Sequence, residues 1–152
     1  MVAISHLSRR LADDFPTLTF TEGDVFVWSP TKNTITYDPS DERATSLLLH
    51  ELGHATLHHN EYTRDVTLLG METDAWAAAR TLAETYEVSL DDDHVESHLD
   101  TYREWLHKRS TCPACEATGL QIKTQQYRCL ACNHEWRVNE ARICALRRYS
   151  LT

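Results

Sequence analysis

The sequence predicts an α+β protein in two parts, a body over residues 1–109 and a smaller module over residues 110–152. Apolar side chains recur every three or four residues in three segments of the body, as in helices that bury one face. Three short runs rich in β-branched and aromatic residues follow the first of these segments. The composition changes near Ser110: nine basic and 20 acidic residues precede it, and six basic and three acidic residues lie from there to the end. With 41% apolar and 25% charged residues, the chain has a globular composition, which excludes a disordered or repetitive protein.

The body is expected to begin with a helix and a small sheet. Ile4, Leu7 and Leu11 share helical spacing, and the Asp13–Pro16 segment ends the pattern. Turn-forming residues then separate three runs of strand composition, over residues 17–21, 24–28 and 33–37. Because these runs are so close in sequence, we expect a mostly antiparallel meander.

Three further helices are expected after the sheet. The first should run over about residues 40–59, because the Asp38–Asp41 segment offers capping oxygens and a proline suited to a first turn. Gly70 is expected to break the chain before a second, Ala-rich helix over residues 72–86. The third should run from Ser89 to about Lys108, with acidic residues near its start and basic residues at its end, as the helix dipole favours.

Residues 50–54 read HELGH, which is the HExxH motif, and they lie on the first of these three helices. At a rise of about 1.5 Å per residue, His50 and His54 would lie about 6 Å apart along one helical face, so both imidazoles can reach one metal ion. Glu51 lies about 100° around the helix, where its carboxylate can reach a water molecule at the ion. A solvated surface helix could carry the same letters by chance. The apolar run at residues 47–49 favours a buried helix instead.

A zinc ion that activates water needs a third protein ligand and an open fourth position. His58 continues the same helical face, but it lies about 12 Å from His50 along the axis, too far to share an ion. Glu72 opens the next helix 18 residues after His54, and Asp74 is its only close rival; we favour Glu72. The metzincin ligand pattern is excluded, because it needs glycine at position 57 and histidine at position 60, where the chain has leucine and asparagine.

The segments HELGHATLHH and METDAWAAARTLA resemble the ImmA/IrrE family of metallopeptidases. The resemblance covers residues 1–107 and implies a minimal zincin fold of the gluzincin type, in which Glu72 is the third zinc ligand. It also implies that an edge strand of the sheet binds peptide by strand addition beside the HExxH helix, and residues 34–37 are the strand we expect there. Trp76 departs from the family, which usually has Asn or Asp at this position.

The chemistry expected at this site is hydrolysis of a peptide bond. A zinc ion on His50, His54 and Glu72 would polarise the carbonyl group and lower the pKa of water toward about 7. Glu51 would take a proton from the water and pass it to the leaving nitrogen. We therefore expect a zinc-dependent endopeptidase acting on a protein or peptide, and the ImmA/IrrE resemblance implies a regulatory role.

The C-terminal module carries two CxxC pairs separated by 13 residues, which is the arrangement of a zinc ribbon. The four thiolates would close the coordination sphere of a second, structural zinc ion: Cys112, Cys115, Cys129 and Cys132. The metal would supply stability that a segment of about 40 residues lacks, and apolar residues between the pairs suit a small hairpin. Two paired CxxC motifs argue against the rival, redox role. The fifth cysteine, Cys144, is expected to be a buried thiol.

Basic side chains of the module are candidate contacts to nucleic acid: Arg128, Arg137, Arg142, Arg147 and Arg148. Nearby aromatic rings could stack on bases while the guanidinium groups bind phosphates. The alternative is that the module only caps the body or binds another protein. An HExxH motif followed by a ribbon is similar to the SprT-like proteases, and this similarity implies substrates bound to DNA.

No run of about 18 apolar residues is present, and the N-terminal residues do not read as a signal peptide. We therefore expect a cytoplasmic protein with two zinc ions and no membrane partner. The alternative hypothesis is a non-enzymatic zinc protein, a regulator or adaptor that keeps the same fold to bind protein or DNA. Glu51 favours the enzyme, because a purely structural site needs no general base.

Overall fold

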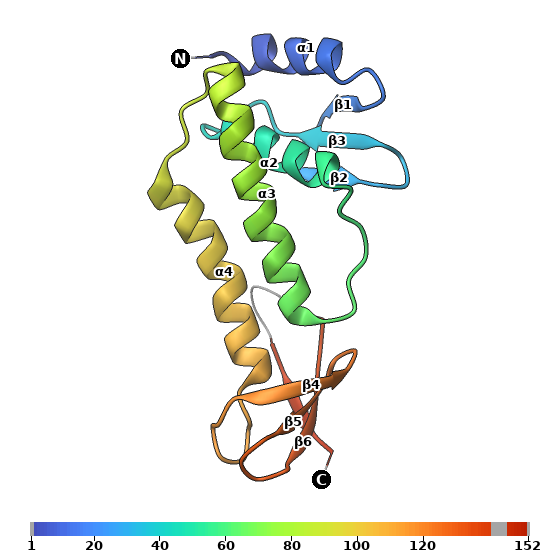
Figure 1. Cartoon of the computed structure of the whole chain (residues 1–152), viewed down its shortest axis with the longest axis vertical. Helices are drawn as coiled ribbons and strands as arrows, with labels where there is room; N and C mark the ends of the chain where they lie inside the picture. The colour runs from blue at the N-terminus through green and yellow to red at the C-terminus, as the bar shows by residue number, and fades with distance from the viewer. Residues whose placement is uncertain (1, 141–145, 152) are drawn as a thin grey trace. The chain divides into compact units, whose positions relative to one another are not determined.

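Four helices and two small sheets make up the described part of the chain, residues 2–140 and 146–151, in a computed structural model (Figure 1). The α+β class is therefore confirmed. Contacts group the chain into two units, Met1–Asn60 with Met71–Val95 and Glu61–Gly70 with Glu96–Thr152. Two helices, α3 (Asp65–Tyr86) and α4 (Asp92–Ser110), contribute residues to both units. None of the helices in the described ranges combines the length and apolar character needed to cross a bilayer.

The first unit begins with α1 (Ile4–Asp14), as predicted, and Leu7 and Leu11 are fully buried on one face of it. Three short strands follow: β1 (Thr19–Glu22), β2 (Val27–Ser29) and β3 (Thr34–Tyr37). Their positions agree with the three predicted runs to within a few residues. The sheet therefore forms where the β-branched and aromatic residues gather.

The order of the strands differs from the predicted meander, which is wrong. β3 lies in the centre of the sheet, with β1 parallel on one side and β2 antiparallel on the other. The Gly23 N–H donates to the Tyr37 carbonyl at 2.8 Å, so the chain continues along β3 and does not turn back after β1. Of the three strands, β3 has the most buried side chains, since Ile35 and Tyr37 are both buried. It takes the central position, where a strand is paired along both edges.

The HExxH motif lies on α2 (Ala44–Thr56), which contacts β2 and β3. Its apolar face is fully buried and consists of Leu48, Leu49 and Leu52. The helix begins at Ala44, later than predicted, because the carboxylates of Asp38 and Asp41 accept N–H bonds from Ser40 and Arg43 in turns that precede it. These turns satisfy donors before the helix starts.

The predicted break at Gly70 is also wrong, since α3 runs without interruption from Asp65 to Tyr86. A glycine inside a helix costs about 1 kcal/mol relative to alanine, which the packing of a 22-residue helix can offset. A Cβ atom built at Gly70 would meet no atom within 4 Å, so nothing in the structure requires glycine there. The next helix, α4, begins where Asp91 accepts a hydrogen bond from the Asp93 N–H at 3.0 Å.

The second unit contains a four-stranded antiparallel sheet in chain order. Its strands are β4 (Gly119–Lys123), β5 (Gln126–Cys129), β6 (Glu135–Val138) and β7 (Arg148–Ser150). The β4–β5 pair confirms the hairpin predicted between the CxxC motifs, whereas β7 was not predicted. The core of this sheet is small, and it consists of Cys112, Tyr127, Cys129, Trp136 and Val138. That the module needs a metal ion to fold stays a prediction.

Candidate metal centres

Three side chains of the first unit converge through their ligand atoms. His50 Nε2 lies 2.8 Å from Glu72 Oε2, and His54 Nε2 lies 3.2 Å from both of these atoms. All three residues are buried: His50 is 2% exposed, Glu72 is 6% exposed and His54 is 8% exposed. Helix α2 presents both histidines from one face, as the spacing of the motif predicts, and α3 presents the glutamate. We call these three residues the histidine site.

The histidine site fits a zinc ion. Tetrahedral coordination with bonds of about 2.0 to 2.1 Å puts ligand atoms roughly 3.3 Å apart, close to the separations seen here. Burial alone would raise the pKa of Glu72, but hydrogen bonds with His50 and His54 hold it well below its usual range. The carboxylate is therefore charged and oriented as a ligand must be. Asp74, the rival candidate, is exposed on α3.

Close packing of α2 on α3 allows this convergence. A Cβ atom at Gly53 would lie 2.4 Å from the carbonyl oxygen of Ala75, so only glycine permits the helices to approach this closely. Trp76, which is 1% exposed, stacks on the His50 ring with 4.2 Å between centroids and 28° between planes. Trp76 therefore contacts a predicted ligand through its ring.

Glu51 lies beside the histidine site on α2 and is half-buried. Burial raises the pKa of its carboxyl group to about 7. The charge of His54 and the Trp28 backbone N–H act to lower this pKa, whereas the charge of Glu72 acts to raise it. A carboxyl group with a pKa near neutrality can accept and return a proton, as a general base must.

The strand expected to bind peptide is not at an edge. Residues 34–37 form β3, which is paired on both sides, so this prediction is wrong. The edge strands of this sheet are β1 and β2, and β2 is the one that contacts α2. The edge position was implied by the ImmA/IrrE resemblance, and the spacing of the residues does not determine which strand lies at an edge.

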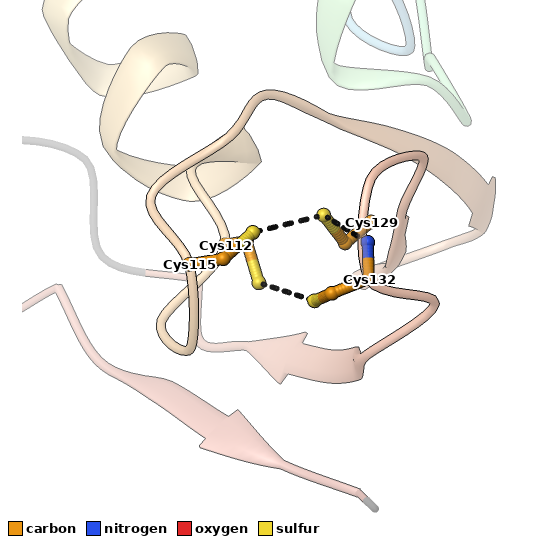
Figure 2. Close-up of side chains that lie close together, drawn as sticks. All are labelled: Cys112, Cys115, Cys129 and Cys132. Carbon is orange, nitrogen blue, oxygen red and sulfur yellow. Dashed lines mark hydrogen bonds between the residues drawn. The ribbon is translucent and has the colours of Figure 1, made fainter.

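The four ribbon cysteines form a second cluster (Figure 2). Cys112 Sγ lies 3.7 Å from Cys132 Sγ, and Cys115 Sγ lies 3.4 Å from Cys129 Sγ; all four sulfur atoms are within 4.8 Å of one another. Tetrahedral bonds of about 2.3 Å to zinc would put them about 3.8 Å apart. The four are thiols and not disulfides. This group, which we call the cysteine cluster, could hold a metal ion.

Backbone N–H groups support the thiolates of the cysteine cluster. Ala114 N–H donates to Cys112 Sγ at 3.4 Å, and Ala131 and Cys132 donate to Cys129 Sγ at 3.3 and 3.5 Å. The pKa of Cys129 falls to about 7, mainly because of the bond from Cys132 N–H. Donors aimed at sulfur stabilise the charged form that binds metal.

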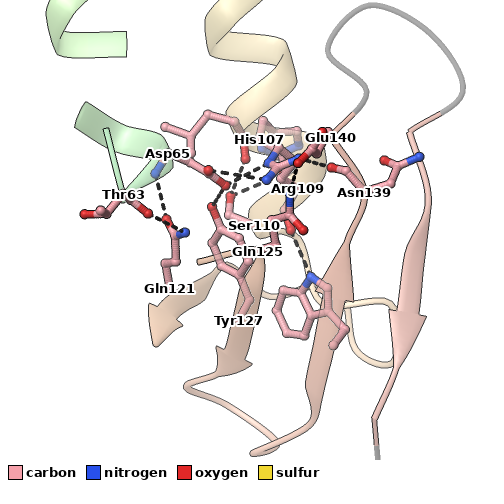
Figure 3. Close-up of polar contacts among 12 residues, drawn as sticks. Thr63, Asp65, His107, Arg109, Ser110, Gln121, Gln125, Tyr127, Asn139 and Glu140 are labelled. Carbon is pink, nitrogen blue, oxygen red and sulfur yellow. Dashed lines mark hydrogen bonds and ion pairs between the residues drawn. The ribbon is translucent and has the colours of Figure 1, made fainter. Parts of the chain in front are cut away.

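A buried polar network in the second unit was missed by the sequence reasoning (Figure 3). The Asp65 carboxylate accepts hydrogen bonds from Arg109 Nε at 2.7 Å and from the Tyr127 hydroxyl at 2.5 Å. The Asp65 N–H donates to the side-chain oxygen of Gln121 at 2.7 Å, and Trp136 Nε1 donates to the Arg109 carbonyl at 2.9 Å. The network thus joins the first turn of α3, the last turn of α4 and the ribbon sheet. No sequence motif marks it, because residues that bond to each other are up to 62 positions apart.

The basic side chains proposed to contact nucleic acid are partly engaged within the ribbon. Arg128 pairs with Glu135 at 2.7 Å, Arg137 lies over the Tyr149 ring at 4.8 Å, and Arg148 donates to the Thr111 carbonyl at 2.7 Å. The side chain of Arg147 is exposed. Two further predictions, Arg142 as a contact and Cys144 as a buried thiol, lie outside the described residues.

Comparisons with known proteins give no relative for this chain: no protein-family profile, no curated protein and no solved structure matches it. The chemical assignment of the two sites therefore rests on their geometry and on the motifs that build them.

Proposed function

We propose that the protein is a zinc-dependent endopeptidase with a minimal zincin fold. The observation that carries the proposal is the buried convergence of His50, His54 and Glu72 within 3.2 Å of one another, with Glu51 beside them. Two imidazoles and a carboxylate are the protein ligands of catalytic zinc sites that leave one position open. The alternative, a non-enzymatic regulator or adaptor, explains the three ligands but gives no role to the half-buried glutamate.

The residues of the site divide the work of hydrolysis. When bound, a zinc ion supplies a Lewis acid that polarises the substrate carbonyl and lowers the pKa of water. Glu51 takes a proton from the attacking water and delivers it to the amine nitrogen as the peptide bond breaks. Trp76 stacks on His50 and keeps bulk water away from that ligand.

Replacing the base tests this function. Glu51→Gln removes the proton acceptor but keeps the size of the side chain, so hydrolysis should fall by about 100-fold to 10,000-fold while zinc binding is retained. Cleavage of a mixed peptide library by the full chain, read by mass spectrometry, measures the loss. Glu84→Gln, at an exposed position of α3, is the matched control and should cleave as wild type does. Undiminished hydrolysis by Glu51→Gln would contradict the mechanism.

The ribbon is proposed to bring a substrate protein or DNA to the peptidase. Strand register places Arg128 and Glu135 in one row and Arg137 and Tyr149 in the next, on the face opposite the buried Tyr127. Glu135 neutralises Arg128 on this exposed face, so Arg137 beside Tyr149 is the proposed contact to an acidic partner. Binding of the full chain to single- and double-stranded DNA should fall with salt and weaken in Arg137→Gln. No binding at low salt would remove DNA and leave protein as the partner.

The remaining parts of the proposal follow from the same chemistry. Four reduced cysteines fit a reducing compartment such as the cytoplasm, where thiols bind metal and do not oxidise to disulfides. The ImmA/IrrE resemblance of the motif segments supports a regulatory protease. The cysteine cluster would hold a structural zinc ion, because four thiolates leave no open position for water.

A further inference from the structure

The chain folds back on the histidine site immediately after α2 ends. His58 has φ 55°, and this left-handed residue turns the backbone so that the His59 N–H donates to the His54 carbonyl at 3.0 Å. The turn brings the His59 ring beside the His54 ring, with 5.1 Å between centroids. His59 Nδ1 then lies 2.8 Å from His54 Nδ1. His59 therefore contacts a predicted zinc ligand through the nitrogen that the ion would not use.

Two nitrogen atoms at this distance share one proton, so one must donate and the other must accept. If His54 Nε2 presents its lone pair to a cation, the neutral His54 ring carries its proton at Nδ1. His54 Nδ1–H is then the donor and His59 Nδ1 is the acceptor. It follows that neutral His59 carries its own proton at Nε2. The contact thus fixes the tautomers of both rings.

Trp28 holds His59 in place from the neighbouring strand. Its indole Nε1–H donates to the His59 carbonyl at 3.0 Å. One residue of β2 therefore braces the turn that carries His59. Trp28 is half-buried, so solvent competes only in part for this bond.

We propose that His59 is a positioning residue that fixes the tautomer and ring orientation of His54 for zinc binding, with Trp28 holding His59 in turn. This inference rests on the proposed function only in that the histidine site binds zinc. Groups that hydrogen-bond to a metal-ligating histidine typically contribute 10-fold to 100-fold to metal affinity. His59→Leu should therefore weaken zinc binding at the histidine site by about 10-fold to 100-fold and leave the cysteine cluster loaded.

The test measures zinc affinity of the full chain by competition with a chelator, and the tautomers from imidazole ¹⁵N shifts. His59→Asn restores an acceptor near Nδ1 and should keep the affinity within about threefold of wild type, in contrast to His59→Leu. His58→Asn, which suits the left-handed backbone, is the matched control and should match wild type. If His59→Leu does not fold, Trp28→Phe still tests the brace, with an expected loss of about fivefold from one hydrogen bond.

Wild-type affinity in both His59→Leu and Trp28→Phe, or a zinc-loaded protein in which His59 carries its proton at Nδ1, would overturn the inference. A wild-type chain whose histidine site binds no zinc would overturn both this inference and the proposed function. Zinc binding with the predicted tautomers but without hydrolysis would leave the positioning role standing and refute the peptidase alone.

Discussion

The histidine site of the first unit and the cysteine cluster of the second can each hold a metal ion, but they are built differently. The histidine site takes three ligand atoms from two long helices and buries them among apolar side chains. The cysteine cluster takes four sulfur atoms from two tight turns, and two of its members are exposed. With a metal ion bound, three protein ligands would leave one position open for chemistry, whereas four ligands on short turns would add stability to a small core.

Removing metal should produce the largest difference between the two regions. Cys129→Ala breaks the cysteine cluster, and the second unit should lose stability on the order of 10 kcal/mol, since so small a core depends on its metal. The expected result is loss of amide-exchange protection across Gly119–Lys123 and the strands that follow, while protection in Ala44–Thr56 persists. His50→Ala is the counterpart: it should lose the other zinc ion and keep the ribbon protected. Unchanged amide exchange in the ribbon of Cys129→Ala would contradict the claim that the cysteine cluster stabilises the second unit.

The next largest effect is expected at the buried ion pair of the second unit. Asp65→Ala leaves the Arg109 guanidinium buried without its carboxylate and should cost about 3 to 5 kcal/mol in denaturant unfolding. Asp100→Ala removes one of the two carboxylate partners of an exposed arginine, Arg103, at a similar distance, and should change stability by less than about 1 kcal/mol. Equal effects of the two substitutions would show that burial of the Asp65 pair has no consequence.

Two glycines on neighbouring helices should respond in opposite directions. Gly53→Ala forces a Cβ atom against the Ala75 carbonyl, only 2.4 Å away, and should destabilise the first unit by about 1 to 3 kcal/mol and weaken zinc binding. Gly70→Ala, at an exposed and open position of α3, should stabilise by up to about 1 kcal/mol. Thermal unfolding measures both. A neutral Gly53→Ala would mean that the helices need not approach so closely.

The sequence predicted those parts of the fold that depend on local pattern. The helix that carries His50 and His54 and the hairpin before Cys129 follow from periodicity and spacing, and the structure has both. That these residues bind zinc stays a prediction. The pairing of β1 with β3 could not be predicted, because it depends on which strand takes the central position and is paired along both edges.

Polar contacts between distant segments were equally out of reach of the sequence. The bond between Asp65 and Tyr127 joins residues 62 positions apart, and neither belongs to a recognisable motif. The contact between His54 and His59 was easier to approach, since both lie in one run of histidines, but its geometry depends on the left-handed turn at His58. Gly70 shows the opposite case: a local signal for a break was overridden by the packing of a long helix.

The central claim is that one chain carries two zinc centres with different roles, and the zinc content of purified variants tests it most directly. Elemental analysis and native mass spectrometry should find two zinc ions per wild-type chain. Glu72→Ala should lose the zinc ion of the histidine site and retain one. Cys129→Ala should lose the zinc ion of the cysteine cluster and also retain one. A single zinc ion in the wild-type chain, or two retained in Glu72→Ala, would contradict the account.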